Sequence, residues 1–162
     1  MPLWIKAPLE VLTLADELIA EFYDHLQGAD IGFVFREDTP VSNGRPTLGG
    51  AEVVSSKLTT YLKLQFMIWL PQDAWIDAQP LQKRAMLDSL LYSCRFDDET
   101  GKAKIIKPDV QEHSEIIERY GLWNRELWTA KRAFMAAIQY RFQLFDDRSG
   151  ARLALDPALM EE

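Results

Sequence analysis

Cysteine and histidine are scarce in this sequence. Cys94 is its single cysteine, which excludes an internal disulfide and any multi-cysteine metal site. The apolar helical pattern around it predicts a buried thiol. The two histidines, His25 and His113, lie far apart in the chain and have no metal-ligand spacing. We expect both to be partly exposed; the alternative is a relocated metal or acid–base site, with Glu112 and Glu115 near His113.

Long apolar runs are also missing. No run approaches the roughly 18 apolar residues that a membrane-spanning helix needs. The first ten residues, MPLWIKAPLE, lack the basic segment and the apolar core of a signal peptide. The sequence therefore predicts a cytoplasmic protein.

Positive charge is in the minority. The chain has 18 basic and 25 acidic residues, which gives a net charge of -7. An acidic protein gains nothing from counterion release on DNA, so direct nucleic-acid binding is disfavoured. The same charge suits a basic partner, including a protein that itself binds nucleic acid. Charge that only maintains solubility is the simpler alternative.

What is present indicates one globular domain spanning residues 1–162, because 162 residues with 48% hydrophobic content can bury a core. Apolar spacing of three and four predicts a first helix from Thr13, as N-cap, to Gln27. β-Branched and aromatic runs predict strands, and a polar run between them predicts a short helix. These segments are Ile31–Arg36, Leu48–Val54 and Leu64–Leu70 as strands, and Ser56–Lys63 as a helix.

The stretch from Pro80 to Trp123 is the landmark of the second half. It predicts a helix opening on Pro80, a charged hairpin, and a second helix capped by Asp109 and ending at Gly121. A last helix is expected over about 125–145, within a C-terminal helical segment of 124–146, and a poorly ordered tail over 147–162. The fold class is therefore α+β, a small curved β-sheet covered by helices, with a long C-terminal helix.

Residues 80–123, ending in PDVQEHSEIIERYGLW, resemble the phage metallopeptidase family, a minimal zincin-like group. The resemblance extends upstream through DELIAEFYDHL, IGFVFRE, GRPTLGGAEVVSSKL and IWLPQDAW, and covers about residues 10–123. It implies a zincin-like minimal core. The family's active helix carries D-H-E-L-x-H, in which two histidines one turn apart bind zinc and the glutamate is the general base.

This chain departs from that pattern at every catalytic position. Ser89 and Ser93 stand at the two histidine positions, and Leu90 stands at the glutamate position. Pro108 stands where the family places a third histidine. Neutral hydroxyls are poor zinc ligands, and leucine cannot accept a proton. We therefore expect no metal, no cofactor and no zinc-peptidase activity, and we regard Ser89, Leu90, Ser93 and Pro108 as vestigial zinc-site positions.

Other residues could carry a different function. Ser89, Tyr92 and Ser93 could form a rebuilt hydrolase site, although no base is assigned to them; the alternative is that the serines bond back to helix carbonyls. Asp97, Asp98 and Glu99 form an acidic hairpin tip that could contact a basic partner, or a solvated turn. Cationic and aromatic residues could also contact a partner, or belong to a solvated face and the core; these are Lys131, Arg132 and Arg141, and Trp4, Trp75, Trp123 and Trp128.

The leading hypothesis is a catalytically inactive, zincin-like phage or prophage protein that acts as a protein-binding module. Inhibition of a host defence or nucleic-acid-processing protein, in the host cytoplasm, is its concrete form. Two alternatives remain open: a hydrolase with a rebuilt non-zinc site, and a structural or oligomeric phage protein built through the wide apolar face of the last helix.

Overall fold

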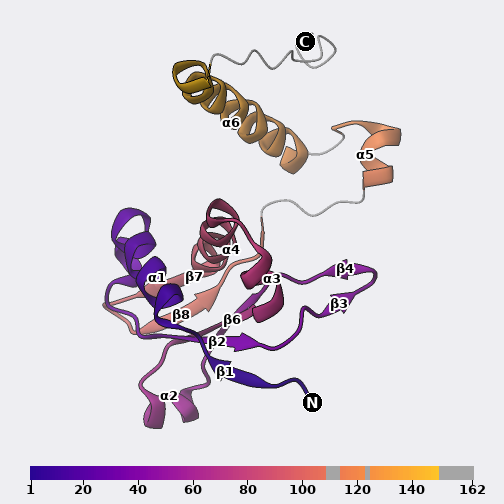
Figure 1. The fold of residues 1–162 in the computed structure, drawn as a ribbon. Coiled ribbons are helices and arrows are strands. Elements are labelled where there is room, and N and C mark those ends of the chain that lie inside the picture. The colour runs from indigo at the N-terminus through magenta and orange to yellow at the C-terminus, as the bar shows by residue number, and fades with distance from the viewer. Residues whose placement is uncertain (109–113, 123–124, 150–162) are drawn as a thin grey trace. The chain divides into compact units, whose positions relative to one another are not determined.

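The computed structural model describes residues 1–108, 114–122 and 125–149, and it divides into two compact units (Figure 1). The first unit is Met1–Lys107 and the second is Pro108–Glu162. Each is described by itself below. The expectation of one domain over 1–162 stays a prediction, and the expected α+β class is confirmed.

A four-stranded sheet forms the base of the first unit, in the order β1-β2-β6-β5. Strands β2 (Ile31–Arg36) and β6 (Phe66–Pro71) run parallel, with Phe33 opposite Ile68. Strand β5 (Gly50–Val53) pairs antiparallel with β6. The three predicted strands are therefore confirmed: β2 has the predicted bounds, and the ends of β5 and β6 are shifted by one or two residues.

Two small elements escaped the sequence analysis. Strand β1 (Trp4–Lys6) adds antiparallel to β2, in a segment expected to be only a lead-in. The loop after β2 contains a hairpin of β3 (Val41–Ser42) and β4 (Arg45–Pro46). Its turn residues Asn43 and Gly44 have φ of 51° and 74°, the two left-handed positions that an Asn-Gly hairpin turn requires.

The first helix begins earlier than expected. Helix α1 spans Leu9–Phe22 with Pro8 at the N-cap position, so the prediction of Thr13 as N-cap was wrong. Proline suits the start of a helix because the first backbone N–H groups have no partner within the helix. A short 3-10 helix, η1 (Asp24–Leu26), follows instead of a continuation to Gln27.

Helices α2 and α4 agree with the predictions made from the sequence. Helix α2 (Ser56–Leu62) is capped by Ser55, whose hydroxyl oxygen accepts from the Leu58 N–H at 3.5 Å. Helix α3 (Gln72–Asp77) leads to α4 (Pro80–Ser93), which begins at the predicted proline. Strands β7 (Cys94–Asp97) and β8 (Lys102–Ile105) then form the predicted charged hairpin.

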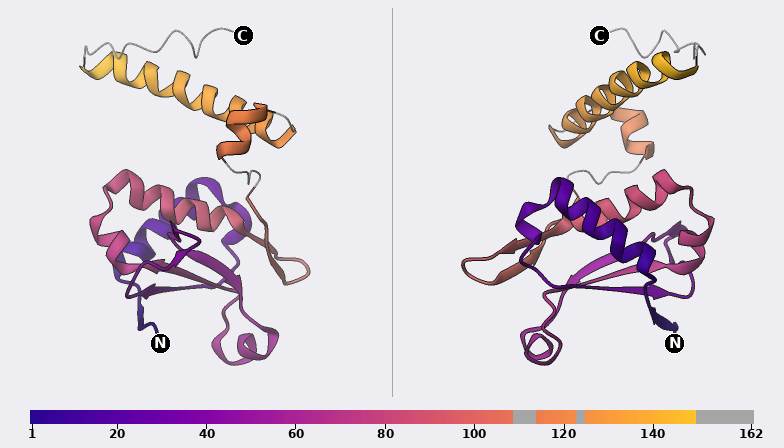
Figure 2. Two further views of the ribbon diagram at one scale, coloured as in Figure 1. Left: turned by 90° about the vertical axis from the view of Figure 1, so that its right-hand side faces the viewer. Right: turned by 60° about the vertical axis from the view of Figure 1, so that its left-hand side comes forward.

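One hydrophobic core joins the sheet to the helices above it. Helices α1 and α4 lie side by side over one face of the sheet (Figure 2). The largest fully buried side chains include Trp75, Phe66 and Leu18. Cys94 is fully buried as well, which confirms the predicted buried thiol. The core therefore fixes α4, the helix that carries Ser89, Leu90 and Ser93, to a sheet.

The second unit contains two helices. Helix α5 (Ser114–Tyr120) ends as predicted at Gly121, whose φ is 65° and whose N–H donates to the Ile117 carbonyl. Helix α6 (Arg125–Ser149) runs past the predicted end at residue 145. The Asp109 cap and most of the predicted tail lie outside the described residues. None of the described helices is long and apolar enough to cross a membrane.

Candidate functional site

Helix α4 positions the candidate site. It begins at Pro80, and the Gln79 N–H just before it donates to the Gln82 side-chain oxygen at 2.9 Å. Its inner side buries Leu87 and Leu91 completely in the core. Since 3.6 residues make one turn, the residues between and beside these two must face the rim of the core or the solvent.

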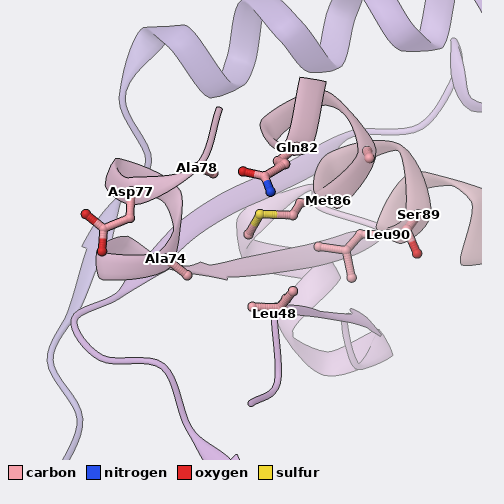
Figure 3. Close-up of a pocket in the computed structure, with 10 residues that line it drawn as sticks. Leu48, Ala74, Asp77, Ala78, Gln82, Met86, Ser89 and Leu90 are labelled. Atoms are coloured by element: carbon pink, nitrogen blue, oxygen red, sulfur yellow. The ribbon is translucent and has the colours of Figure 1, made fainter. Parts of the chain in front are cut away.

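Ser89, Leu90 and Ser93 occupy that rim. Ser89 is exposed, whereas Leu90 and Ser93 are half-buried. The Ser93 hydroxyl donates to the Leu90 carbonyl oxygen at 2.6 Å, which confirms for Ser93 the predicted bond back to the helix. Figure 3 shows Ser89 and Leu90 side by side along one wall of a pocket. Ser89 and Leu90 therefore both line this pocket.

Leu90 closes part of this opening against the neighbouring strand. A Cβ added to Gly49 would lie 2.7 Å from Leu90 Cδ1 and 2.8 Å from the Trp69 carbonyl oxygen. Gly49 also has φ of 135°, which side-chain-bearing residues rarely adopt. Glycine is thus required at position 49 by its backbone and by the leucine packed on it. The position at which the family's pattern has a glutamate is part of an apolar contact.

The pocket is a mostly apolar cleft of about 670 Å³. Leu48, residues of α3 and residues of α4 surround it (Figure 3), and Gly49 lines it as well. Asp77 and Gln82 contribute its polar groups together with Ser89. A cleft of this size and composition suits an apolar side chain or a small apolar ligand, oriented by a few polar groups.

The residues at the vestigial positions do not fit a zinc ion. Zinc sites use imidazole, thiolate or carboxylate ligands, and Ser89 and Leu90 offer none of these. Among the described residues, no three His, Cys, Asp or Glu side chains gather as metal ligands would. Pro108 is exposed and is the first residue of the second unit. No catalytic step through zinc can be derived from these groups.

The rebuilt-hydrolase alternative requires a base at a serine. Within the described part of the chain, neither Ser89 nor Ser93 is hydrogen-bonded to a histidine or a carboxylate. His25 is half-buried, as expected, and its Nε2 lies 3.1 Å from the Cys94 carbonyl oxygen. His113 lies outside the described residues. The hydrolase alternative stays a prediction.

A buried tyrosine beneath the site was missed by the sequence analysis. The Tyr23 hydroxyl, from the end of α1, donates to the Asp88 carboxylate and lies 3.2 Å from the Asp88 carbonyl oxygen. Burial, and then the bond to Asp88, raise the pKa of Tyr23 well above its ordinary range. Asp88 is the one residue of the D-H-E-L-x-H pattern, besides its leucine, that this chain keeps. Only the fold could reveal its partner, 65 residues away.

The acidic hairpin tip is largely engaged within the hairpin and its neighbour. The Asp97 carboxylate accepts from the Glu99 and Thr100 N–H groups and from the Thr100 hydroxyl, and these bonds lower the pKa of Asp97. The Asp98 carboxylate lies directly over Gly28. Glu99 is exposed. The contact of Asp97, Asp98 and Glu99 with a basic partner stays a prediction.

The aromatic candidates separate into core and surface. Trp75 is buried, and its indole N–H donates to Glu10 at 3.3 Å. Trp4 is half exposed and meets Trp69 edge-on, with ring centroids 6.0 Å apart. Trp128 is exposed, and Lys131 Nζ lies 5.3 Å from its ring. Trp123 and the side chain of Arg141 lie outside the described residues.

Comparison with known proteins places this arrangement in a class. The described residues form an α+β domain in which α4 lies over a mixed sheet beside a mostly apolar cleft. The chain matches the family model described as "Putative phage metallopeptidase" over residues 3–131. It belongs to this family, and the resemblance stated from the sequence is confirmed. Neither the curated proteins nor the solved structures gave a match.

Proposed function

We propose that this chain is a catalytically inactive member of the phage metallopeptidase family that acts as a protein-binding module. Its concrete form is an inhibitor of a host defence or nucleic-acid-processing protein in the host cytoplasm. The observation that carries the proposal is Leu90, which stands at the position of the general base and packs against Gly49. A leucine there can neither activate water nor hold a metal.

The cleft beside Leu90 supports a binding role. The cleft is open and mostly apolar, and its lining includes the polar side chains of Asp77, Gln82 and Ser89. Desolvation of an apolar side chain in such a cleft contributes affinity without any chemistry. The net charge of -7 favours approach of a basic partner. Proteins that bind nucleic acid are typically basic and are partners of this kind.

Metal analysis tests the loss of the zinc site. Purified protein dialysed against a weak chelator is expected to hold far less than one zinc per chain. A variant with Ser89→His, Leu90→Glu and Ser93→His, which places two histidines one turn apart on α4, is expected to hold more zinc than the unmodified protein. Ser89→His and Ser93→His alone are the matched controls. Stoichiometric zinc in the unmodified protein would contradict the proposal.

Blocking the cleft tests the binding role. Ala85 lines the cleft on α4, and Ala20 is an exposed alanine on α1. The tagged Ala85→Arg variant is expected to lose a host protein that the unmodified chain captures, because the arginine fills the cleft. The Ala20→Arg variant is expected to retain that protein. Equal capture by both variants would exclude the cleft as the contact.

A structural or oligomeric role is the second candidate. It is favoured by exposed apolar side chains on α6, namely Trp128, Phe134 and Ile138. Exposed apolar surface of this kind marks association sites. Light scattering distinguishes the two candidates: a monomer at all concentrations excludes the oligomeric one, and a concentration-dependent mass that Phe134→Ser abolishes supports it.

A further inference from the structure

The β7–β8 hairpin separates its residues into two faces. In its register Arg95 is opposite Lys104 and Asp97 is opposite Lys102, whereas Cys94 is opposite Ile105 and Phe96 is opposite Ala103. Because side chains alternate along a strand, the first two pairs share one face. The face with Cys94 and Phe96 packs on the core. The other face, with three cations and one carboxylate, is here named the cationic face. The hairpin itself is labelled β7 and β8 in Figure 1.

Like charges oppose each other on the cationic face. Arg95 and Lys104 are directly cross-strand, an arrangement that destabilises a hairpin unless an anion lies nearby. The Asp97 carboxylate instead accepts three hydrogen bonds from Glu99 and Thr100 in the turn of the hairpin. All salt bridges found within the described residues use other cations, namely Arg36, Lys83 and Arg84. The pair Arg95 and Lys104 therefore has no carboxylate partner there.

Arg95 is held in place before any ligand arrives. Its Nη1 donates to the Cys94 carbonyl at 3.0 Å and to the Tyr92 carbonyl at the end of α4. Its guanidinium carbon lies 4.7 Å from the centroid of the exposed Tyr92 ring. These contacts fix one cation, while the ammonium groups of Lys102 and Lys104 stay exposed on flexible stems.

A hollow covers this face. It has a volume of about 470 Å³ and is lined by residues of β7 and β8 alone: Arg95, Phe96, Asp97, Lys102, Ala103 and Lys104. The unpaired cations thus line a concave surface rather than a convex one. With three cations and the Asp97 carboxylate the hollow has an excess of positive charge, and a concave surface with such an excess concentrates anions.

We propose that the cationic face binds an extended acidic segment of a partner protein. Lys102 and Lys104 alternate on β8, so their stems leave the strand about 6.6 Å apart, which is also the spacing of carboxylates at alternate positions of an extended peptide. A long polyanion such as nucleic acid meets the net charge of -7 of the whole chain, whereas a short acidic segment of an otherwise basic partner meets only this face. The inference rests on the proposed function only in taking the partner to be a protein.

A peptide titration tests the proposal with the whole chain. The probe is a fluorescein-labelled peptide with aspartate at alternate positions, and its anisotropy is followed at about 50 mM and about 200 mM salt. We expect saturable binding that weakens at the higher salt. A second peptide with the same number of aspartates spaced four residues apart is expected to bind more weakly.

Two double variants with the same charge change locate the site. Lys102→Gln with Lys104→Gln is expected to weaken binding about tenfold. Lys6→Gln with Lys57→Gln, at exposed positions of β1 and α2, is expected to change it by less than about twofold. Far-ultraviolet circular dichroism checks that both variants fold.

Three results would overturn the proposal: no binding by the unmodified chain, equal weakening by the two double variants, or tighter binding of a labelled single-stranded oligonucleotide than of the alternating peptide. None of them bears on the zinc and Ala85 experiments, because Lys102 and Lys104 do not line the cleft beside Leu90. Failure here is therefore distinguishable from failure of the proposed function.

Discussion

Asp88 has a structural role that can be tested at the level of a single residue. It lies next to Ser89 in the sequence, but it does not line the cleft. Its carboxylate accepts a hydrogen bond from the buried Tyr23 hydroxyl. A hydrogen bond to a charged acceptor contributes more than one between neutral groups. The bond ties the end of α1 to α4. The kept aspartate therefore has a structural role that is independent of zinc.

Removing the Tyr23 hydroxyl tests that role. Tyr23→Phe is expected to lower the free energy of unfolding by about 1–2 kcal/mol, because the half-buried carboxylate loses its donor. Tyr61→Phe is the matched control, since Tyr61 is 87% exposed, and it is expected to change stability by less than about 0.5 kcal/mol. Urea unfolding measures both. Equal stability of the two variants would show that the Tyr23–Asp88 bond contributes nothing.

Burial of Cys94 and Tyr23 makes stability depend on alkaline pH. Burial raises the pKa of Cys94 from near 9 to about 11, and the pKa of Tyr23 is raised further. Above pH 9 the folded chain therefore binds more protons than the unfolded chain, so stability is full below this pH and falls as pH rises. Urea unfolding from pH 8 upward is expected to show this decline. Cys94→Ala is expected to make it shallower between pH 9 and 11, and an unchanged slope would contradict the argument.

At the scale of elements, the contact between α4 and the strand segment before β5 decides the shape of the site. Gly49 and Gly101 both have positive φ, but only Gly49 faces other atoms. The Trp69 carbonyl near Gly49 belongs to the backbone of β6 and cannot move aside as a flexible side chain could. The close packing of Leu90 therefore depends on a missing side chain.

Alanine substitutions at these two glycines separate the two effects. Gly101→Ala is expected to cost about 1 kcal/mol, the penalty for a side chain at positive φ. Gly49→Ala is expected to cost about 3 kcal/mol or more, because overpacking against Leu90 and Trp69 is added. Chemical unfolding measures the difference. A Gly49→Ala variant as stable as Gly101→Ala would show that Leu90 does not pack there in solution.

The whole chain consists of two compact units, and the buried core cluster lies within the first. Its members run from Ala7 to Cys94 and join β2, β6, α1 and α4. A chain with one contiguous core has what it needs to fold alone. The first unit is therefore the natural object for a truncation.

A chain that ends at Lys107 is expected to fold by itself. It should show the circular dichroism of an α+β protein and one cooperative thermal transition. The expectation follows because every member of the core cluster is retained. A non-cooperative melt, with apolar-dye binding at low temperature, would show that the second unit is needed for the core to form.

The sequence alone determined the order of most elements and the chemical type of the side chains at positions 89, 90 and 93. Strong local signals carried this: Pro80 at a helix start, Gly121 at a helix end, and the apolar run that became β6. Local signals failed for β1, because three exposed residues become a strand only when β2 offers its edge. They failed for Thr13 because Pro8 begins the helix five residues earlier.

Only the tertiary structure decided which groups meet. Chemical type shows that Leu90 cannot be a base, but not that it packs on Gly49. Likewise, the acidic tip was evident in the sequence, whereas the opposition of Arg95 and Lys104 exists only in the hairpin register. The physical reason is range: helix starts and turns depend on neighbours in the chain, whereas burial, hydrogen-bond partners and charge pairing depend on residues that folding brings together from afar.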